Sequence, residues 1–399
     1  MTAFFNTGLS QKQFLDEYWQ KKPLVIRQAF PLPVSDLTPD DLAAFAGDED
    51  IESRLIQEFG TKPWQLEHGP FDESDFAALP DTHWTLLVQD MDKHYPPLQN
   101  MLTAFDFLAD WRRDDVMISY APEGGSVGPH TDSYDVFLLQ AQGTRHWQIS
   151  DMPIPDAVFR DDTELRILQQ FAADQSWELL PGDMLYLPPH FAHHGVALNP
   201  CLTFSAGFRA PSQFQLLDAF IHTLQEQDIA EQLYADADVT EVASATEIDV
   251  STLQRFQTLL LETINENTNL IPLAVGRLVT ETKSTLQDLA EEFVTDKATL
   301  VELDERFYAG EYLQRNDYLR FAWHKHSAAA YLFVAGEAYC VELAAAEHLP
   351  WLTTKAQVQH ADWQSIRSFP MLMETCRELI AEGAWYWPED FAQAILPDV

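Results

Sequence analysis

The stretch GGSVGPHTDSYDVFLLQAQGTRHW at residues 124–147 contains the residues that decide the fold prediction. It passes from a glycine-rich loop into an apolar run, and His130 and Asp132 stand two positions apart where the run begins. Side chains at that spacing on a strand point to the same face of a sheet. An imidazole beside a carboxylate makes two arms of a 2-His-1-carboxylate site, which holds Fe(II) and leaves coordination positions open. A His-x-Asp triplet alone is a weak signal, so the prediction depends on the rest of the chain.

The arginine at position 145 adds a second indication of such a site. It follows His130 by 15 residues, after a turn at residues 142–144. We predict that RHWQIS at 145–150 pairs with YDVFLLQ at 134–140 as a hairpin. An arginine that faces into an apolar barrel costs free energy unless it meets an anion, and an acidic co-substrate would bind it through two hydrogen bonds. The alternative is a surface arginine on an edge strand, and this stretch leaves both interpretations open.

A third arm of the site is expected from PGDMLYLPPHFAHHGVAL at residues 181–198. The pattern predicts a tight turn at 181–183, a buried strand at 184–187, a bend at the two prolines and a returning strand from about Ala192.

Three histidines in this stretch are candidates for the third ligand. His190 lies at the bend, where we expect it to face solvent. His193 shares a face of the returning strand with Gly195 and Ala197, which leave room for a co-substrate. His194 shares the other face with apolar residues, which is typical of packing, and we expect it to be partly buried and hydrogen-bonded. The alternation favours His193.

The whole chain predicts an α+β protein of three parts. Short strands separated by turn residues indicate a sandwich or barrel between about 51 and 210, after helices near 12–19 and 36–46, the second capped by Thr38 before Pro39. Helical spacing follows at 211–227 and 251–266, then a hairpin around Gly336–Glu337 and a last helix at 369–383. We expect domains at 1–210, 211–300 and 301–399.

The composition restricts the class of protein. With 399 residues, 46% apolar and 22% charged, the chain has a globular composition and the length for several domains. Its apolar runs are short and its first residues lack a signal-peptide pattern, so we expect neither a membrane span nor export. The three cysteines are far apart and form no CxxC pair, which favours a reducing cytoplasm.

The net charge of −39, from 24 basic and 63 acidic residues, argues against direct binding of nucleic acid. A protein that binds phosphates needs a dense basic stripe, and the sequence offers only pairs of basic residues. One interpretation of the acidity is solubility in a salty or cold habitat. The other is electrostatic attraction to a protein rich in lysine and arginine.

These motifs together resemble a known family. HTD with Arg145 downstream, followed by PGDMLYLPPHFAH, is similar to the JmjC-type oxygenases, which use Fe(II), 2-oxoglutarate and O2. The bacterial ribosomal oxygenases are more similar still, over about residues 10–215, in SRLIQ, HGPF, WTLLVQDMD, MISYAPEGGSVGPHTDSYDVFLLQ and SAGFRAP. The resemblance implies a cupin-like double-stranded β-helix (a jelly roll) with N-terminal helices, a helical dimerisation segment at 211–300 and a winged-helix-like C-terminal domain.

The same resemblance implies a reaction and its site. His130, Asp132 and His193 would be the catalytic iron ligands, and Arg145 would anchor the distal carboxylate of 2-oxoglutarate. The substrate would be a basic protein of the large ribosomal subunit, "L-sixteen", hydroxylated on the β-carbon of an arginine.

Hydroxyl groups are expected beside the co-substrate. Thr203 or Ser205 would reach 2-oxoglutarate or the metal-bound water. The family often has a hydroxyl residue just before the glycine-rich loop, but Ala121 stands there in this chain. We therefore expect Tyr120 or a water molecule to provide this contact to the co-substrate.

For the substrate guanidinium, the matching positions are Asp115, Met117 and Tyr134. Without the resemblance, Asp115 would be interpreted as a turn residue at a strand start and Tyr134 as a core aromatic. Two rival functions stay open: an oxygenase of the same chemistry with another target, such as a histidine hydroxylase or a demethylase, and a non-enzymatic cupin that binds a metal. An inward-pointing Arg145 would argue against the second.

Overall fold

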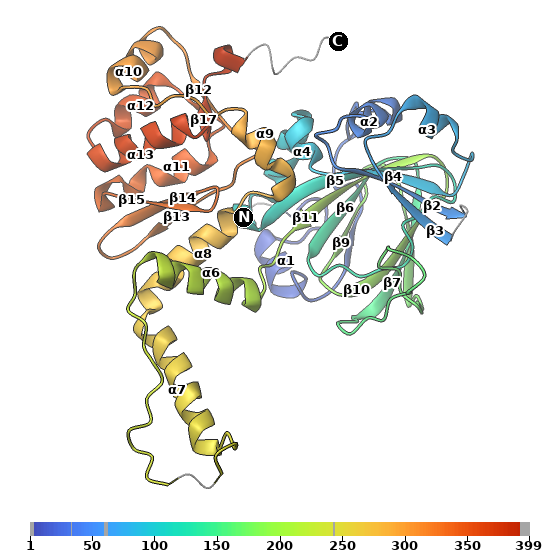
Figure 1. Cartoon of the computed structure of the whole chain (residues 1–399). Helices are drawn as coiled ribbons and strands as arrows, with labels where there is room; N and C mark the ends of the chain where they lie inside the picture. The colour runs from blue at the N-terminus through green and yellow to red at the C-terminus, as the bar shows by residue number, and fades with distance from the viewer. Residues whose placement is uncertain (1–3, 33, 60–62, 242–243, 392–399) are drawn as a thin grey trace. The chain divides into compact units, whose positions relative to one another are not determined.

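The structure is a computed structural model that describes residues 4–32, 34–59, 63–241 and 244–391. The chain divides into two compact units, Met1–Ala210 and Pro211–Val399 (Figure 1). Each unit has its own apolar core. None of the helices in the described ranges combines the length and the apolar character that a membrane crossing requires.

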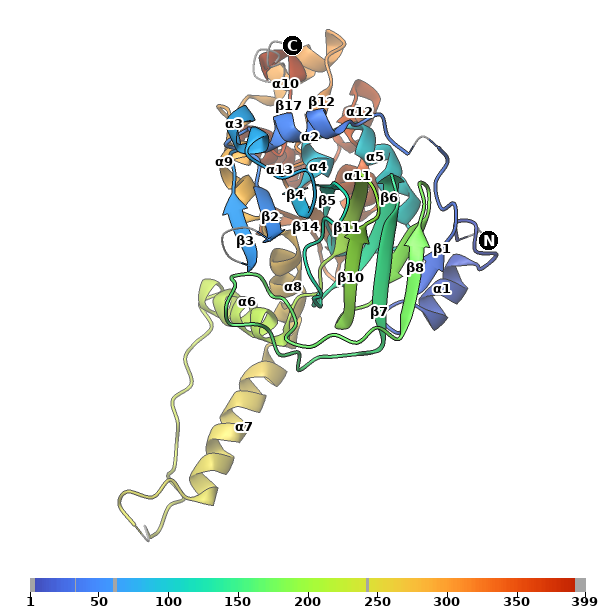
Figure 2. The same ribbon diagram turned by 90° about the vertical axis from the view of Figure 1, so that its right-hand side faces the viewer.

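Two antiparallel sheets form the first unit (Figure 2). The larger sheet has eight strands in the order β1-β9-β6-β11-β5-β4-β2-β3, and the smaller has three in the order β10-β7-β8. This arrangement confirms the predicted cupin-like jelly roll. The strands are β1 Leu24–Ile26, β2 Ser53–Phe59, β3 Pro63–His68, β4 Trp84–Val88, β5 Arg113–Ala121, β6 Asp135–Gln142, β7 Arg145–Pro153, β8 Gln175–Leu179, β9 Met184–Leu187, β10 Phe191–Ala197 and β11 Cys201–Phe208.

Short helices accompany the larger sheet. The predicted cap of the second helix is present, with Thr38 accepting a hydrogen bond from the backbone N–H of Asp41 and Pro39 at the first helical position. The strand that begins at Trp84 ends at Val88, and a helix begins at Met91. The helices are α1 Gln11–Glu17, α2 Pro39–Ala46, α3 Glu73–Ala77, α4 Met91–His94 and α5 Pro97–Leu102, with 3-10 turns η1 Thr103–Phe105 and η2 Asp110–Arg112.

The two faces of the larger sheet have separate packing partners. On the outer face, aromatic side chains pack around α1, and the rings of Phe14 and Tyr186 lie 5.0 Å apart. On the inner face, Val136 and Leu138 of β6 pack with Trp147 of β7 in the apolar layer between the sheets. This layering leaves the inner face of the barrel as the place for a site.

The predicted hairpin between 134–140 and 145–150 is wrong. Strand β6 pairs with β9 and β11, whereas β7 pairs with β10 and β8 in the other sheet. The chain changes sheets at Gly143, which has a φ of +67° and no room for a side chain: an added Cβ would lie 2.1 Å from the carbonyl oxygen of Pro200. Two adjacent alternating runs do not reveal which strands they pair with, so the sequence pattern could not exclude this change of sheet.

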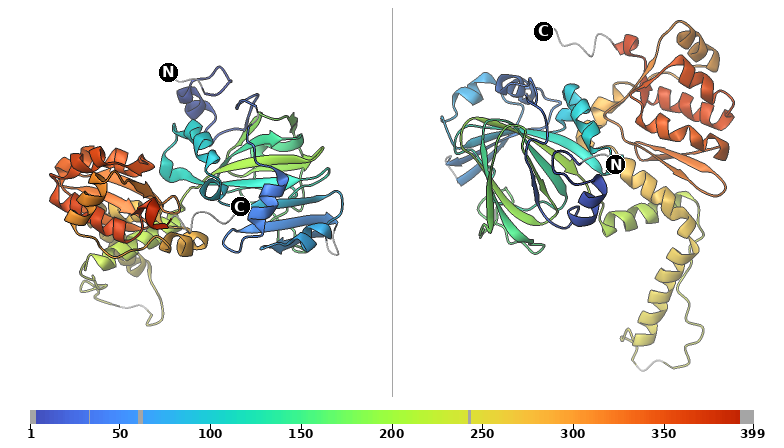
Figure 3. Two further views of the ribbon diagram at one scale, coloured as in Figure 1. Left: turned by 90° about the horizontal axis from the view of Figure 1, so that it is seen from above. Right: turned by 180° about the vertical axis from the view of Figure 1, so that it is seen from behind.

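The second unit combines helices with two three-stranded sheets, ordered β16-β12-β17 and β13-β14-β15 (Figure 3). The predicted hairpin is present, but its turn is Ala335–Gly336 and Glu337 already begins the returning strand. The division of this unit at residue 300 and its winged-helix class stay predictions. Its elements are α6 Gln213–Glu226, α7 Val250–Glu266, η3 Thr268–Leu270, α8 Ile271–Thr280, η4 Ser284–Leu286, α9 Gln287–Glu291, α10 Leu300–Tyr308, β12 Leu313–Arg315, β13 Phe321–Lys325, β14 Ala330–Val334, β15 Glu337–Val341, η5 Leu343–Glu347, α11 Leu349–Thr354, β16 Gln357–Val358, α12 His360–Ile366, α13 Pro370–Ala381, β17 Trp385–Tyr386 and η6 Pro388–Phe391.

Candidate functional site

Two imidazoles and a carboxylate converge inside the barrel of the first unit. His130 and Asp132 lie in the segment before β6, and His193 lies on β10. The backbone N–H of His130 donates to the carbonyl of His193 over 3.0 Å, and the reverse bond is 2.9 Å long. Asp132 oxygens lie 3.9 Å from Nε2 of His130 and 3.5 Å from Nε2 of His193. One possible ligand atom from each residue lies within 4.8 Å of the others, a spacing suited to one metal ion.

Hydrogen bonds of the two histidines leave the correct nitrogen free for a metal. Nδ1 of His130 lies 2.9 Å from the carbonyl oxygen of Gly128, and Nδ1 of His193 lies 3.0 Å from that of Phe191. A carbonyl can only accept, so each Nδ1 carries the proton and each Nε2 presents its lone pair. Burial lowers the pKa of His193 to about 4, and the neighbouring His130 adds to the shift. This donor set fits Fe(II).

The two neighbouring histidines do not join this group. His190 has a φ of +67° and is half-buried, and its backbone N–H donates to the carbonyl of Asp132 over 2.7 Å. The expectation that it only faces solvent missed this backbone contact, which holds the Asp132 segment in place. His194 is half-buried and meets the ring of Phe171 edge-on.

Arg145 points into the barrel and has no acidic partner among the described residues. Its side chain is buried, with 4% of the residue exposed, and burial lowers its pKa. Nη1 donates to Oγ of Ser119 and Oγ1 of Thr203, both at 3.2 Å, while Nε has no hydrogen-bond partner in the described ranges. A buried guanidinium surrounded only by neutral groups is costly unless an anion binds beside it. The surface-arginine alternative is therefore excluded.

The hydroxyl groups around Arg145 differ in part from expectation. Tyr120 is excluded, because it lies on the opposite face of β5 and packs against Trp84. Sequence analysis missed Ser119, although it stands two residues before Ala121 and so shares its face. Thr203 or Ser205 was expected near the co-substrate, and of the two it is Thr203 that contacts Arg145; its hydroxyl also donates to the side-chain oxygen of Gln140 over 3.2 Å.

One cavity of about 210 Å³ is lined by the triad, by Arg145 and by the hydroxyl residues that Arg145 contacts. Gly195 does not provide the open space that the sequence suggested, because the indole of Trp147 fills it: an added Cβ would lie 2.7 Å from that ring. Arg54, Trp147 and Arg166 also line the cavity and were not anticipated. The remaining lining residues are Ile56, Leu87, Met117, Ser119, Val127, His130, Asp132, Tyr134, Val136, Leu138, Arg145, Leu165, His193, Thr203 and Ser205.

Two of the expected substrate-binding residues, Met117 and Tyr134, line this cavity, whereas Asp115 does not. Tyr134 is partly exposed, and the charge of Asp132 raises its pKa. Asp115 is buried, and its carboxylate accepts from the side chain of Gln89 and the backbone of Asp90, both at 3.4 Å. A Cβ added at Gly207 would lie 3.4 Å from Oδ1 of Asp115 and 3.8 Å from the Tyr134 ring. The absence of a side chain at Gly207 thus keeps a gap open between the two.

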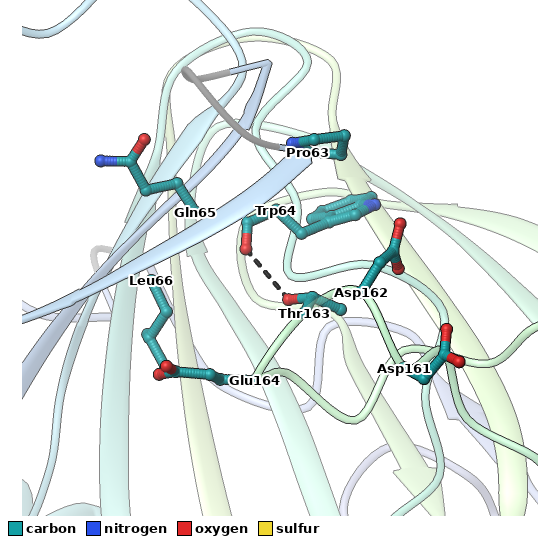
Figure 4. Close-up of a pocket in the computed structure, with 8 residues that line it drawn as sticks. All are labelled: Pro63, Trp64, Gln65, Leu66, Asp161, Asp162, Thr163 and Glu164. Atoms are coloured by element: carbon teal, nitrogen blue, oxygen red, sulfur yellow. Dashed lines mark hydrogen bonds between the residues drawn. The ribbon is translucent and has the colours of Figure 1, made fainter.

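A second cavity, of about 480 Å³, lies between β3 and an acidic loop (Figure 4). The hydroxyl of Thr163 donates to the carbonyl of Trp64 over 3.1 Å and ties the loop to the strand. Asp162 pairs with Arg160, while Asp161 and Glu164 also line the cavity. The loop continues directly into Leu165 and Arg166 of the first cavity.

Comparisons with known proteins agree with this geometry. The family model described as a JmjC domain matches residues 100–216. The Escherichia coli (strain K12) ribosomal protein uL16 3-hydroxylase is 36% identical over 269 residues, which is 66% of this chain and 69% of that protein. A probable ribosomal oxygenase from Haemophilus influenzae is 42% identical over 216 residues, 54% of this chain and 53% of that one.

A solved structure extends the similarity to nearly the whole chain. The ribosomal oxygenase YcfD from Escherichia coli, in complex with cobalt and 2-oxoglutarate, superposes with a TM-score of 0.76 at 27% identity. The match covers 95% of this chain and 98% of that one. Both compact units therefore have counterparts in that structure.

Proposed function

The chain belongs to the JmjC-domain ribosomal oxygenases, and from this premise we propose that it is an Fe(II)- and 2-oxoglutarate-dependent protein hydroxylase. The observation that carries the proposal is one cavity that contains both a metal-binding triad and a buried arginine without an acidic partner among the described residues. When bound, iron and 2-oxoglutarate supply the oxidising power that inserts one atom of O2 into a C–H bond, with succinate and CO2 as the other products. A non-enzymatic cupin that only holds a metal does not require a buried guanidinium without an acidic partner.

The chain's own residues bind and orient these groups. His130, Asp132 and His193 hold the metal, and the Nδ1 hydrogen bonds of both histidines fix the ring orientation. Arg145 binds the distal carboxylate, with the hydroxyls of Ser119 and Thr203 as further donors. Ser205 lines the same cavity two residues after Thr203 and completes the polar wall. The surrounding apolar side chains exclude water and so strengthen each of these contacts.

The substrate is an arginine side chain of a large-subunit ribosomal protein, hydroxylated on its β-carbon. Three observations support this choice. Asp115 supplies a buried carboxylate for a guanidinium, and Tyr134 and Met117 offer flat and apolar surface for its stem. The net charge of −39 attracts a basic partner, which implies binding that weakens as salt rises. The Escherichia coli relative is named for the ribosomal protein uL16.

The setting of the enzyme follows from the same premise. We place it in the cytoplasm with a ribosomal protein as its partner, without direct contact to nucleic acid, because the acidic chain would repel phosphates. We also expect a homodimer formed through residues 211–300. Exposed apolar side chains on α6 and α7 support this assembly.

The test is turnover with a defined substrate. Purified protein with Fe(II), 2-oxoglutarate and O2 is expected to form succinate and to add one oxygen atom to ribosomal protein uL16, on an arginine located by fragment mass spectrometry. Replacing that arginine of the substrate with lysine should abolish the mass gain. Oxygen found on a histidine, or loss of methyl groups from lysine, would assign another target within the same chemistry. No succinate and no mass gain on any large-subunit protein would overturn the proposal.

A further inference from the structure

Trp147 lines the cavity close to both ends of the proposed co-substrate site. It stands two residues after Arg145 on β7 and shares its inward face. The guanidinium carbon of Arg145 lies 5.6 Å from the centroid of the indole ring, and the His193 ring lies 5.9 Å from it on the triad side. The indole therefore lies near both groups that would hold the two ends of a bound dicarboxylate.

The indole is also held in one orientation by the strand that carries His193. Trp147 and Gly195 are paired across β7 and β10, and a Cβ at Gly195 would lie 2.7 Å from the outer carbons of the ring. The residue is 5% exposed and packs in the apolar layer between the sheets. A ring fixed in this way offers its N–H in a preset position, which lowers the entropy cost of using it to bind a ligand.

The N–H of this indole has no hydrogen-bond partner among the residues that the structure describes. Nε1 of Trp147 is buried and unpaired, and so is Nε of its neighbour Arg145. A buried tryptophan N–H normally finds an acceptor, and leaving it without one costs free energy. Both unpaired atoms are donors, and both side chains line the same cavity. The group that would satisfy them is rich in acceptors, as a carboxylate is.

We propose that Trp147 is a co-substrate-binding residue whose indole N–H donates a hydrogen bond to a carboxylate of 2-oxoglutarate. The inference rests on the proposed function and adds a second donor residue, next to Arg145, to its co-substrate site. It also explains why position 195 is a glycine: any side chain there would displace the indole from the co-substrate.

The test compares two tryptophans that face each other across neighbouring strands. Trp147→Phe keeps an aromatic ring and removes the N–H, and Trp177→Phe is the matched control, because Trp177 pairs with Trp147 and packs in the same layer but does not line the cavity. Calorimetric titration of the zinc-loaded protein with 2-oxoglutarate should show binding weakened about tenfold or more in Trp147→Phe and unchanged in Trp177→Phe. Zinc affinity, measured without 2-oxoglutarate, should be equal in all three proteins.

Binding of 2-oxoglutarate by Trp147→Phe within twofold of the wild type would overturn the inference while leaving the proposed function intact. A wild-type protein that does not bind 2-oxoglutarate would overturn both. If Trp147→Phe does not fold, the inference is tested on the wild-type protein by nuclear magnetic resonance with ¹⁵N-labelled indole groups. One of the 11 tryptophan N–H signals should move downfield when 2-oxoglutarate is added to the zinc-loaded protein. If none moves, the inference is wrong.

Discussion

At the residue scale, the buried guanidinium of Arg145 should favour binding of 2-oxoglutarate and lower the stability of the ligand-free protein. Without a ligand it has two neutral hydroxyl partners and no acidic partner among the described residues. We expect Arg145→Met to leave the ligand-free protein equally stable or to raise its free energy of unfolding by about 1 kcal/mol or more, because a desolvated charge is removed. The same variant should no longer be stabilised by 2-oxoglutarate. Urea denaturation of both proteins with and without the ligand measures both effects, and a clear loss of stability without ligand would contradict the argument.

A second prediction at this scale concerns the gap kept open by Gly207. A leucine there would fill the space between Asp115 and Tyr134, where we place the substrate side chain. We expect Gly207→Leu to lower kcat/KM for the ribosomal protein by about tenfold or more, as filling a fitted pocket does. Formation of succinate without protein substrate should continue at its wild-type rate. Gly207→Ala is the control, because its Cβ would make only ordinary contacts of 3.4 Å and longer.

The metal-binding residues could be predicted from the sequence better than those around the co-substrate. His130, Asp132 and His193 follow from local alternation and from a spacing that the strands preserve. Ser119 shares a face of β5 with Met117 and Ala121, but the missing hydroxyl at Ala121 directed the search to Tyr120 on the other face. In the sequence, Trp147 looks like an ordinary core tryptophan. Only its unpaired N–H in the structure distinguishes it from other core residues.

At the element scale, strand positions could be predicted from the sequence but one pairing could not. From His193 onward, buried and half-buried residues alternate along β10, as expected for a strand whose two faces have different surroundings. The partner of β7 depends on Gly143, where the chain passes from one sheet to the other. The same short turn can join two paired strands of a hairpin or two strands of different sheets. Which of the two forms depends on contacts with residues distant in sequence.

A buried polar network joins η2, β6, β9 and the turn after α1 in the first unit. Asp135, at the start of β6, accepts hydrogen bonds from Gln20, Arg112 and Tyr186 at 3.0, 3.0 and 2.6 Å. Burial raises its pKa, while the three donors oppose the shift. Arg112→Met leaves this carboxylate without its cation, so we expect a loss of about 3 kcal/mol in the free energy of unfolding.

Urea denaturation measures this loss, and the adjacent Arg113→Met provides its control. Within the described part of the chain, Arg113 pairs with Asp106 and Asp110 alone, and their carboxylates are largely exposed. Such pairs contribute little to stability, so the control should cost much less. Equal losses in the two variants would show that the Asp135 network has no special role.

At the scale of the whole molecule, α7 leaves apolar side chains uncovered by the described residues. The helix has 17 residues, none of them buried, and helices of that length are marginal in water without packing. Phe256, Leu260 and Leu261 expose apolar surface on it, and Phe214 of α6 is 74% exposed. A second copy of the chain would cover this surface by symmetry. We therefore expect Phe256→Glu combined with Leu260→Glu to convert a dimer into a folded monomer at micromolar concentration, as seen by sedimentation equilibrium. Met152→Glu, which changes an exposed apolar residue of the first unit, should leave the dimer intact, and a wild-type chain that sediments as a monomer would contradict the proposed assembly.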